Sequence, residues 1–254
     1  MHSFSTVCLA AAAVAAPIGT TVPQNDSGLV LRAVRFYRPD MNRTRVKGLV
    51  QIPFSMIQAA SGSAGQLNYT VSVQVVDSTG LTLYEQAWRN RARAQGGSDA
   101  YTVEIVDFVV APGKYRLKVE VEDSVSGRTA SGGIDLQALS RADGASDLLV
   151  APEMRLATAD DTVPRPGEFR TGNNLVTAVA RVLLTPLRAK VYYLLEAYSD
   201  PGETGTMSVA IRDSAGGTTI NTPEVPVTVA AGGSVLKGQL DLTEIGRASC
   251  RERV

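Results

Sequence analysis

Apolar residues occupy every second position in many short stretches of this chain. The clearest stretch covers residues 115–122, where Tyr115, Leu117, Val119 and Val121 alternate with charged side chains. Because successive side chains of a β-strand point to opposite faces, this alternation predicts a strand with one face in a core and the other in water.

The same pattern recurs through the first part of the chain, separated by turn signals such as Asp77-Ser-Thr-Gly80 and Pro112-Gly113. Short alternating runs bounded by Gly, Pro, Asp and Ser are typical of strands in an antiparallel sheet. Seven such strands match the count of an immunoglobulin-like β-sandwich. The expected strands cover residues 29–38, 46–54, 67–75, 81–88, 101–105, 115–121 and 128–137.

One phrase occurs twice, at residues 72–80 and 208–216, and both copies run from an alternating stretch into Asp-Ser-x-Gly. The distance between the copies suits two versions of one domain rather than a short repeat. We therefore expect an all-β chain of two tandem immunoglobulin-like β-sandwich domains. Because nothing in the second copy corresponds to residues 115–137, we expect that domain to be truncated at its C-terminus. Its strands are expected at residues 175–184, 190–198, 206–213, 218–221, 225–229 and 235–242.

Composition divides the chain into five regions. The stretch 141–172 is rich in Asp, Pro, Gly and Arg and is interpreted as a linker, interrupted by a short strand at residues 148–151. We expect residues 25–140 to fold alone as a soluble monomer and residues 141–243 alone to be insoluble or molten. The five regions are a leader with its mature arm (1–23), a first sandwich (24–140), the linker (141–172), a partial second sandwich (173–243) and a tail (244–254).

The two ends differ from the body. Residues 4–16 form an apolar run followed by Pro17, with Ala13-Val14-Ala15 as a cleavage signal, although no Lys or Arg precedes the run. Its length favours a secretory signal peptide over a membrane span, so we expect an extracytoplasmic protein without a transmembrane segment. The tail, residues 244–254, resembles the translation of a sequencing-library adapter, and we expect it to be an artefact that interrupts a longer protein.

Charge and reactive residues restrict the function. The chain has 25 basic and 25 acidic residues, so its balanced charge gives no reason to expect nucleic acid or anionic lipid as a partner. The only histidine is His2, in the leader, and the cysteines are Cys8 and Cys250. Residues 17–243 therefore cannot build a Ser-His-Asp triad, a Cys-His dyad or a His- or Cys-based metal site. We predict no enzyme activity, no cofactor and no catalytic or metal-binding residue.

The lack of His and Cys does not exclude calcium binding, because calcium is bound by oxygen ligands. Asp143, Asp147, Asp160 and Asp161 lie in the expected linker, where carboxylates between tandem sandwiches could serve as calcium ligands. Their spacing matches no calcium-loop pattern, and we favour solvated turn carboxylates as the explanation. The aspartates that precede Ser at turns, Asp77, Asp123 and Asp213, are explained by local hydrogen bonding.

Aromatic residues offer a second candidate site. Trp88, Tyr192, Tyr193 and Tyr198 could form a platform for sugar rings. Because Tyr192 and Tyr193 are adjacent in one strand, they must point to opposite faces, and at least one is expected in the core. An exposed coplanar pair would favour carbohydrate binding, whereas burial would favour a structural role.

Several stretches resemble the N-terminal half of bacterial GWxTD-domain proteins. They are residues 36–46, the Val-Asp-Ser-x-Gly turn, and residues 115–127, 146–151 and 191–198; the naming motif itself is absent. The resemblance implies a β-rich region of an exported protein. We expect a non-enzymatic structural or protein-interaction module whose partners are other proteins or cell-envelope components. The alternative is a carbohydrate-binding accessory region of a longer cell-surface enzyme.

Overall fold

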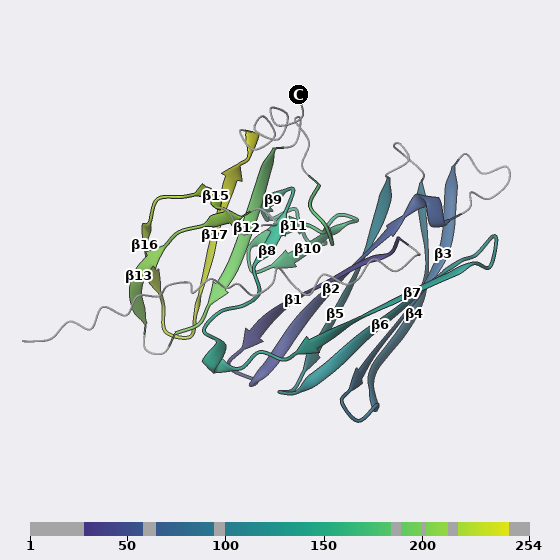
Figure 1. Cartoon of the computed structure of the whole chain (residues 1–254), viewed down its shortest axis with the longest axis horizontal. Coiled ribbons are helices and arrows are strands. Elements are labelled where there is room, and N and C mark those ends of the chain that lie inside the picture. Colours follow the sequence, from purple (N-terminus) through teal and green to yellow (C-terminus); the bar gives the residue numbers. More distant parts are fainter. Residues whose placement is uncertain are drawn as a thin grey trace, which may run out of the picture.

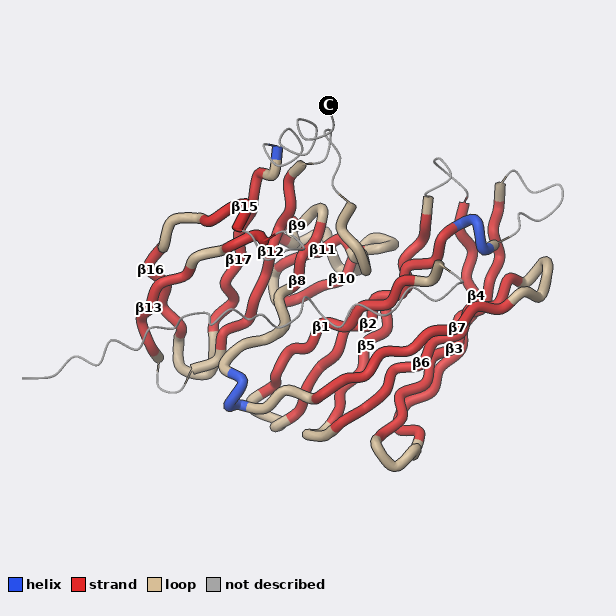
Figure 2. Tube along the Cα trace, viewed as in Figure 1, coloured by secondary structure: helices blue, strands red, loops and turns tan. Residues whose placement is uncertain are grey.

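The described part of the chain is built almost entirely of β-strands. The structure, a computed structural model, describes residues 28–57, 65–93, 100–183, 189–199, 202–212 and 218–243. Seventeen strands and two short 3-10 helices, η1 (Phe54–Met56) and η2 (Arg141–Asp143), form within these residues (Figures 1 and 2). The predicted fold class, an all-β sandwich, is confirmed.

The first seven strands form two antiparallel sheets that pack face to face. Sheet A has the order β1-β2-β5, and sheet B has the order β4-β3-β6-β7. All seven strands lie where alternation predicts them, and β4 and β5 extend further than expected. Sheet A consists of β1 (Val30–Arg38), β2 (Arg43–Pro53) and β5 (Tyr101–Val110). Sheet B consists of β3 (Gln66–Asp77), β4 (Thr82–Arg93), β6 (Lys114–Asp123) and β7 (Thr129–Gln137).

The main hydrophobic core fills the space between sheets A and B. In β6, buried and exposed residues alternate without interruption, as the sequence predicts. Val71 and Val73 of β3 pair with Val121 and Val119 of β6, and all four side chains are buried. Gly48 in β2 lets the sheets approach closely, since a Cβ atom there would lie 3.1 Å from Cδ2 of Leu117. A single methyl group at this point would therefore crowd the core.

Sheet A is buried on its other face as well. Phe36 of β1 and Leu49 of β2 point away from sheet B and form a second core with Leu149, Phe169 and Leu194 from the C-terminal half. The molecule thus has three layers, with sheet A between sheet B and the C-terminal strands (Figure 1). A sheet covered on both faces does not have the polar outer face of an ordinary sandwich sheet.

The C-terminal half consists of shorter strands in several small sheets. The central strand β12 (Lys190–Ala197) lies between β8 (Leu149–Ala151) and β17 (Ser234–Asp241). A second sheet has the order β10-β11-β9, and two further pairs are β13-β16 and β14-β15. These strands are β9 (Met154–Leu156), β10 (Glu168–Thr171), β11 (Asn174–Thr177), β13 (Glu203–Met207), β14 (Ala210–Arg212), β15 (Thr218–Asn221) and β16 (Val225–Val229).

The stretch 141–172 differs from the linker expected there. It contains β8, β9 and β10 as well as η2, and only the short strand near residues 148–151 was anticipated. Leu149 and Phe169 from this stretch are buried against sheet A. Its turns are rich in Pro, Gly and Asp. Strands of only three or four residues between such turns are not recognised from the sequence pattern.

Strand pairing in the second half also departs from the expected order. β11, which begins the second predicted copy, pairs with β9 and β10, whereas its counterpart β1 pairs with β2. The stretch expected as one strand at residues 206–213 is divided between β13 and β14. The second Asp-Ser turn at Asp213, the leader (1–23) with His2 and Cys8, and the tail (244–254) with Cys250 lie outside the described residues.

Side chains of the C-terminal half cover the free edge of β1. The Asp147 carboxylate accepts hydrogen bonds from the backbone N–H and the guanidinium of Arg35, at 2.7–2.8 Å. The Tyr198 hydroxyl accepts from the backbone N–H of Tyr37 at 2.7 Å and donates to Glu196. Covering an edge strand in this way satisfies backbone groups that would otherwise invite pairing with another chain.

The described residues contain no helix of the length and hydropathy that a membrane crossing needs.

Candidate functional site

The four aspartates considered as calcium ligands do not converge on one site. Asp143 accepts from the backbone N–H and hydroxyl of Ser140 and so caps η2, while Asp147 binds Arg35. Asp161 binds Arg155, and Asp160 is exposed in the adjacent turn. Within the described residues, no group of three or more His, Cys, Asp or Glu side chains is arranged to hold a metal ion.

Asp161 belongs to a charged cluster around Arg155. Its carboxylate accepts from both Nη atoms of Arg155, at 2.7 and 2.9 Å, and from the backbone N–H of Thr158. Glu168 accepts from the same guanidinium. The hydrogen bonds from Arg155, followed by those from Thr158, hold the pKa of Asp161 well below its ordinary value.

This shift predicts an acid-dependent stability difference. A carboxylate whose pKa is lower in the folded state stabilises the fold above its unfolded pKa of about 3.9, and this stabilisation is lost as the pH falls through the folded pKa. We expect Asp161→Asn to lower the melting temperature at pH 7 and the gap from wild type to close below about pH 4. Melts recorded by circular dichroism from pH 7 to pH 2 measure this. Asp160→Asn, one residue away and exposed, is the control and should match wild type throughout. A gap that stays constant down to pH 2 contradicts the assignment.

The four aromatic residues considered as a sugar platform do not share one surface. Trp88 packs against the main core and donates from Nε1 to Glu104 at 3.1 Å. Tyr193 lies over Gly238 of the neighbouring strand β17, and Tyr198 meets the ring of Tyr37 edge-on. These three side chains therefore serve packing in three different places. Tyr192, adjacent to Tyr193, is half-buried.

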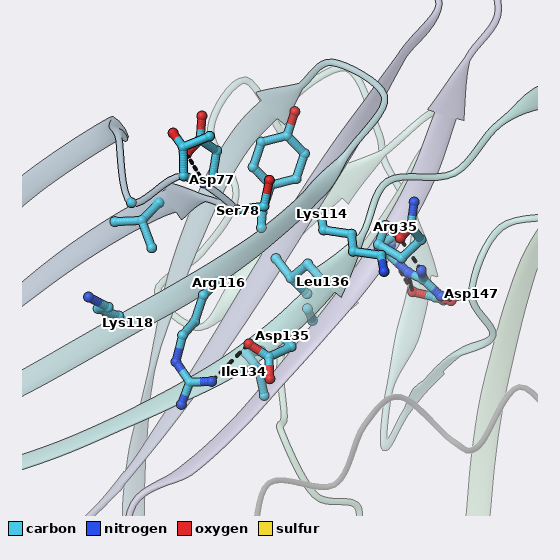
Figure 3. Close-up of a pocket in the computed structure, with 16 residues that line it drawn as sticks. Arg35, Asp77, Ser78, Lys114, Arg116, Lys118, Ile134, Asp135, Leu136 and Asp147 are labelled. Carbon is cyan, nitrogen blue, oxygen red and sulfur yellow. Dashed lines mark hydrogen bonds and ion pairs between the residues drawn. The ribbon is translucent and has the colours of Figure 1, made fainter.

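The structure instead shows a cleft beside the free edge of sheet B. It has a volume of about 920 Å³ and lies between β1, the β3–β4 turn, β6 and β7 (Figure 3). Buried apolar side chains form part of its wall, including Ala33, Val76, Ile134 and Leu136. We call it the β6–β7 cleft. Its volume is in the range of ligand pockets in proteins.

Four basic and three acidic side chains line the β6–β7 cleft. Arg35 is paired with Asp147, and Arg116 is paired with Asp135 at 2.8 Å (Figure 3). Lys114 and Lys118 are exposed and, among the described residues, form no ion pair. The side chains of β6 at these alternate positions share one face of the strand. Within the part of the chain that the structure describes, these two cations at the cleft therefore have no acidic partner.

The β3–β4 turn at the rim of the cleft is ordered by Asp77. Its carboxylate accepts from the backbone N–H groups of Thr79 and Leu81, at 2.8 and 3.0 Å, and from the Thr79 hydroxyl. These bonds, led by that from the Thr79 side chain, lower the pKa of Asp77. Gly80 has φ +90°, a conformation that side-chain-bearing residues rarely adopt. The local role predicted for this Asp-Ser turn is confirmed.

The cleft is not predicted by the sequence, although basic residues that line it are recognisable there. The alternation predicts that Arg116 and Lys118 lie on the water-facing side of a strand, and they do. Alternation shows which face a residue occupies but not which residues of other strands stand beside it. The Ile134 and Leu136 wall comes from β7, and Arg35 comes from β1. No local signal connects these three segments.

No protein-family model matches this chain, and a comparison with curated proteins finds no match. The resemblance to GWxTD-domain proteins stays a prediction.

Proposed function

We propose that this chain is a non-enzymatic protein-interaction module that holds an acidic, extended segment of a partner protein in the β6–β7 cleft. The observation that carries the proposal is the pair Lys114 and Lys118, which form no ion pair among the described residues and lie on the exposed face of sheet B, at a cleft that apolar side chains of the buried face also line. An apolar wall supplies affinity through burial, and charge complementarity supplies orientation and partner choice.

The two lysines, rather than the paired arginines, favour a negatively charged segment over a positive one. Arg35 and Arg116 already have their carboxylates, so the charge left for a ligand comes from Lys114 and Lys118. β7 is an edge strand of sheet B, and an extended segment fits beside such an edge. A partner with alternating acidic and apolar residues would place its apolar side chains against Ile134 and Leu136.

The proposed setting is outside the cytoplasm, among other proteins or cell-envelope components. Its support is the apolar run at residues 4–16 followed by a cleavage signal. Expression with the natural leader tests the setting, because export removes the leader near Ala16, whereas uncleaved protein in the cytoplasm contradicts it.

Peptide binding tests the cleft directly. We expect the full chain to bind a fluorescent octapeptide of alternating Glu and Val, measured by anisotropy, and to ignore the corresponding Lys and Val peptide. The double variant Lys114→Glu with Lys118→Glu should bind the acidic peptide at least about tenfold more weakly, since about 1.4 kcal/mol corresponds to a factor of ten.

The control carries the same change of charge elsewhere. Arg43→Glu with Lys190→Glu alters two exposed residues outside the cleft and should leave binding within about twofold of wild type. Equal losses in the two double variants, or no binding of the acidic peptide to wild type, would show that the cleft is not the site.

A further inference from the structure

Three arginines form a row on β4, at the opposite edge of sheet B from the β6–β7 cleft. Arg89, Arg91 and Arg93 occupy alternate positions of this edge strand and are all exposed. Alternate residues of a strand share a face and lie about 6.6–6.8 Å apart. The row therefore presents three guanidinium groups at regular intervals along one line.

None of the three is neutralised by a carboxylate within the described residues. In the β3–β4 register, Arg89, Arg91 and Arg93 stand opposite the uncharged residues Thr70, Asn68 and Gln66. Elsewhere in the same residues, arginines such as Arg45, Arg116 and Arg155 have acidic partners. The charge of the row is thus left for a ligand.

A polar groove runs beside the row. It has a volume of about 490 Å³ and is lined by Arg89 and Arg91 together with the amides and hydroxyls of Asn68, Thr70 and Ser124. We call it the β4 groove. Guanidinium groups bind carboxylates and sulfates through paired hydrogen bonds, and amides and hydroxyls suit the hydroxyl groups of sugars. Glu122 also lines the groove and is its one acidic side chain.

The strand that carries the row is fixed to the sandwich. The buried carboxylate of Glu104 in β5 accepts hydrogen bonds from Tyr69, Trp88 and Asn90, and thereby joins sheet A to β3 and β4. Burial, followed by the bond to Glu104, raises the pKa of the Tyr69 hydroxyl. The groove is therefore built on rigid elements rather than on loops.

Two other classes of anionic partner fit less well. The backbone N–H of Arg91 is already bonded to the Asn90 side-chain oxygen at 2.7 Å, which opposes strand addition by an acidic peptide at this edge. Nucleic acid binding uses exposed aromatic faces for base stacking, but Trp88 of β4 points toward the core.

We propose that the β4 groove binds an acidic polysaccharide, with its carboxylate or sulfate groups on Arg89, Arg91 and Arg93 and its hydroxyl groups on the polar lining. This site is separate from the β6–β7 cleft and does not depend on the peptide-binding function. It gives the carbohydrate-binding alternative from the sequence a location that the aromatic residues do not supply.

Calorimetric titration of the full chain tests the proposal, with a heparin-derived oligosaccharide as the probe and neutral dextran as its uncharged counterpart. We expect the heparin oligosaccharide to bind and dextran not to bind. Arg89→Ala with Arg91→Ala should weaken binding at least tenfold, and Glu122→Gln should strengthen it severalfold because a repulsive charge is removed. Arg43→Ala with Lys190→Ala removes the same charge at two exposed residues outside both the groove and the cleft and should leave heparin binding within about twofold of wild type.

Each other outcome overturns the proposal. Equal weakening by the Arg43/Lys190 variant and by the Arg89/Arg91 variant would indicate a general charge effect. Binding of polyglutamate or of single-stranded DNA as tight as that of heparin, with the same dependence on Arg89 and Arg91, would assign the groove to another class of polyanion. A heparin affinity unchanged in the arginine variant would show that the arginine row is not part of the binding site.

Discussion

Replacing Phe36 with alanine is expected to lower the free energy of unfolding by about 3–5 kcal/mol, the usual cost of removing a buried phenylalanine. Phe36 is 1 % exposed and belongs to the core that joins sheet A to the C-terminal half. The loss should therefore loosen that half first. Urea denaturation measures the size of the effect, and hydrogen exchange should show lost protection in β8 and β12 before β6.

Phe108→Ala is the matched control. Phe108 is 5 % exposed but lies in the core between sheets A and B. We expect a loss of similar size, with β3 and β6 losing protection instead of β8 and β12. If both variants show the same pattern of exchange, the two cores do not respond separately, and the division of the interior described above is wrong.

Asp147→Ala is expected to cost about 3 kcal/mol, the low end for breaking a buried ion pair. The side chains of Arg35 and Asp147 are 24 % and 11 % exposed, so the guanidinium would lose its partner in a partly buried place. The backbone N–H of Arg35 would lose its acceptor as well. Thermal and urea denaturation of the full chain measure the change.

Asp135→Ala provides the contrast. The Asp135 side chain is 76 % exposed and its partner Arg116 is 49 % exposed, so we expect the loss to be only about 0–1 kcal/mol. Asp147→Asn, which keeps one acceptor oxygen, should fall between the two. An Asp147→Ala variant as stable as Asp135→Ala would mean that the cover over the β1 edge contributes little.

The sandwich could be predicted from the sequence because its strands obey a simple alternation. From Lys114 to Glu122, β6 shows every apolar residue inside and every charged residue outside, as its pattern indicates, and only Asp123 at its end is both charged and buried. β1 does not obey this rule. Arg32 and Arg35 are three positions apart and therefore point to opposite faces of the strand. Arg32 is buried and donates to the Leu148 carbonyl at 2.8 Å, while Arg35 binds Asp147. Long-range partners of this kind leave no local signal.

The candidate sites depended even more on tertiary structure. The sequence drew attention to acidic and aromatic residues because those types often bind ligands, but Asp147 and Tyr198 cover the edge of β1. The lysines of the β6–β7 cleft and the arginines of the β4 groove were visible as polar positions. They are candidates for ligand binding because, within the described residues, no carboxylate lies directly opposite them in a neighbouring strand. Only the strand register reveals this.

The sequence alone predicts that residues 25–140 fold as a monomer, but the second core gives a physical reason to expect a different behaviour. Without the C-terminal half, the outer face of sheet A would expose Val34, Phe36 and Leu49 to water. A contiguous apolar face of this kind promotes association. We therefore expect this fragment to self-associate rather than remain monomeric.

The burial of sheet A on both faces has a consequence for synthesis on the ribosome. Strands β1 to β7 emerge first and can pair among themselves, while β8 and β12, which cover Phe36, are translated later. Contacts between residues so far apart in the chain form slowly, and apolar surface exposed in the meantime is prone to aggregation. The nascent chain is thus prone to aggregation until β12 has left the ribosome. Slower translation of residues 141–197 would lengthen this interval.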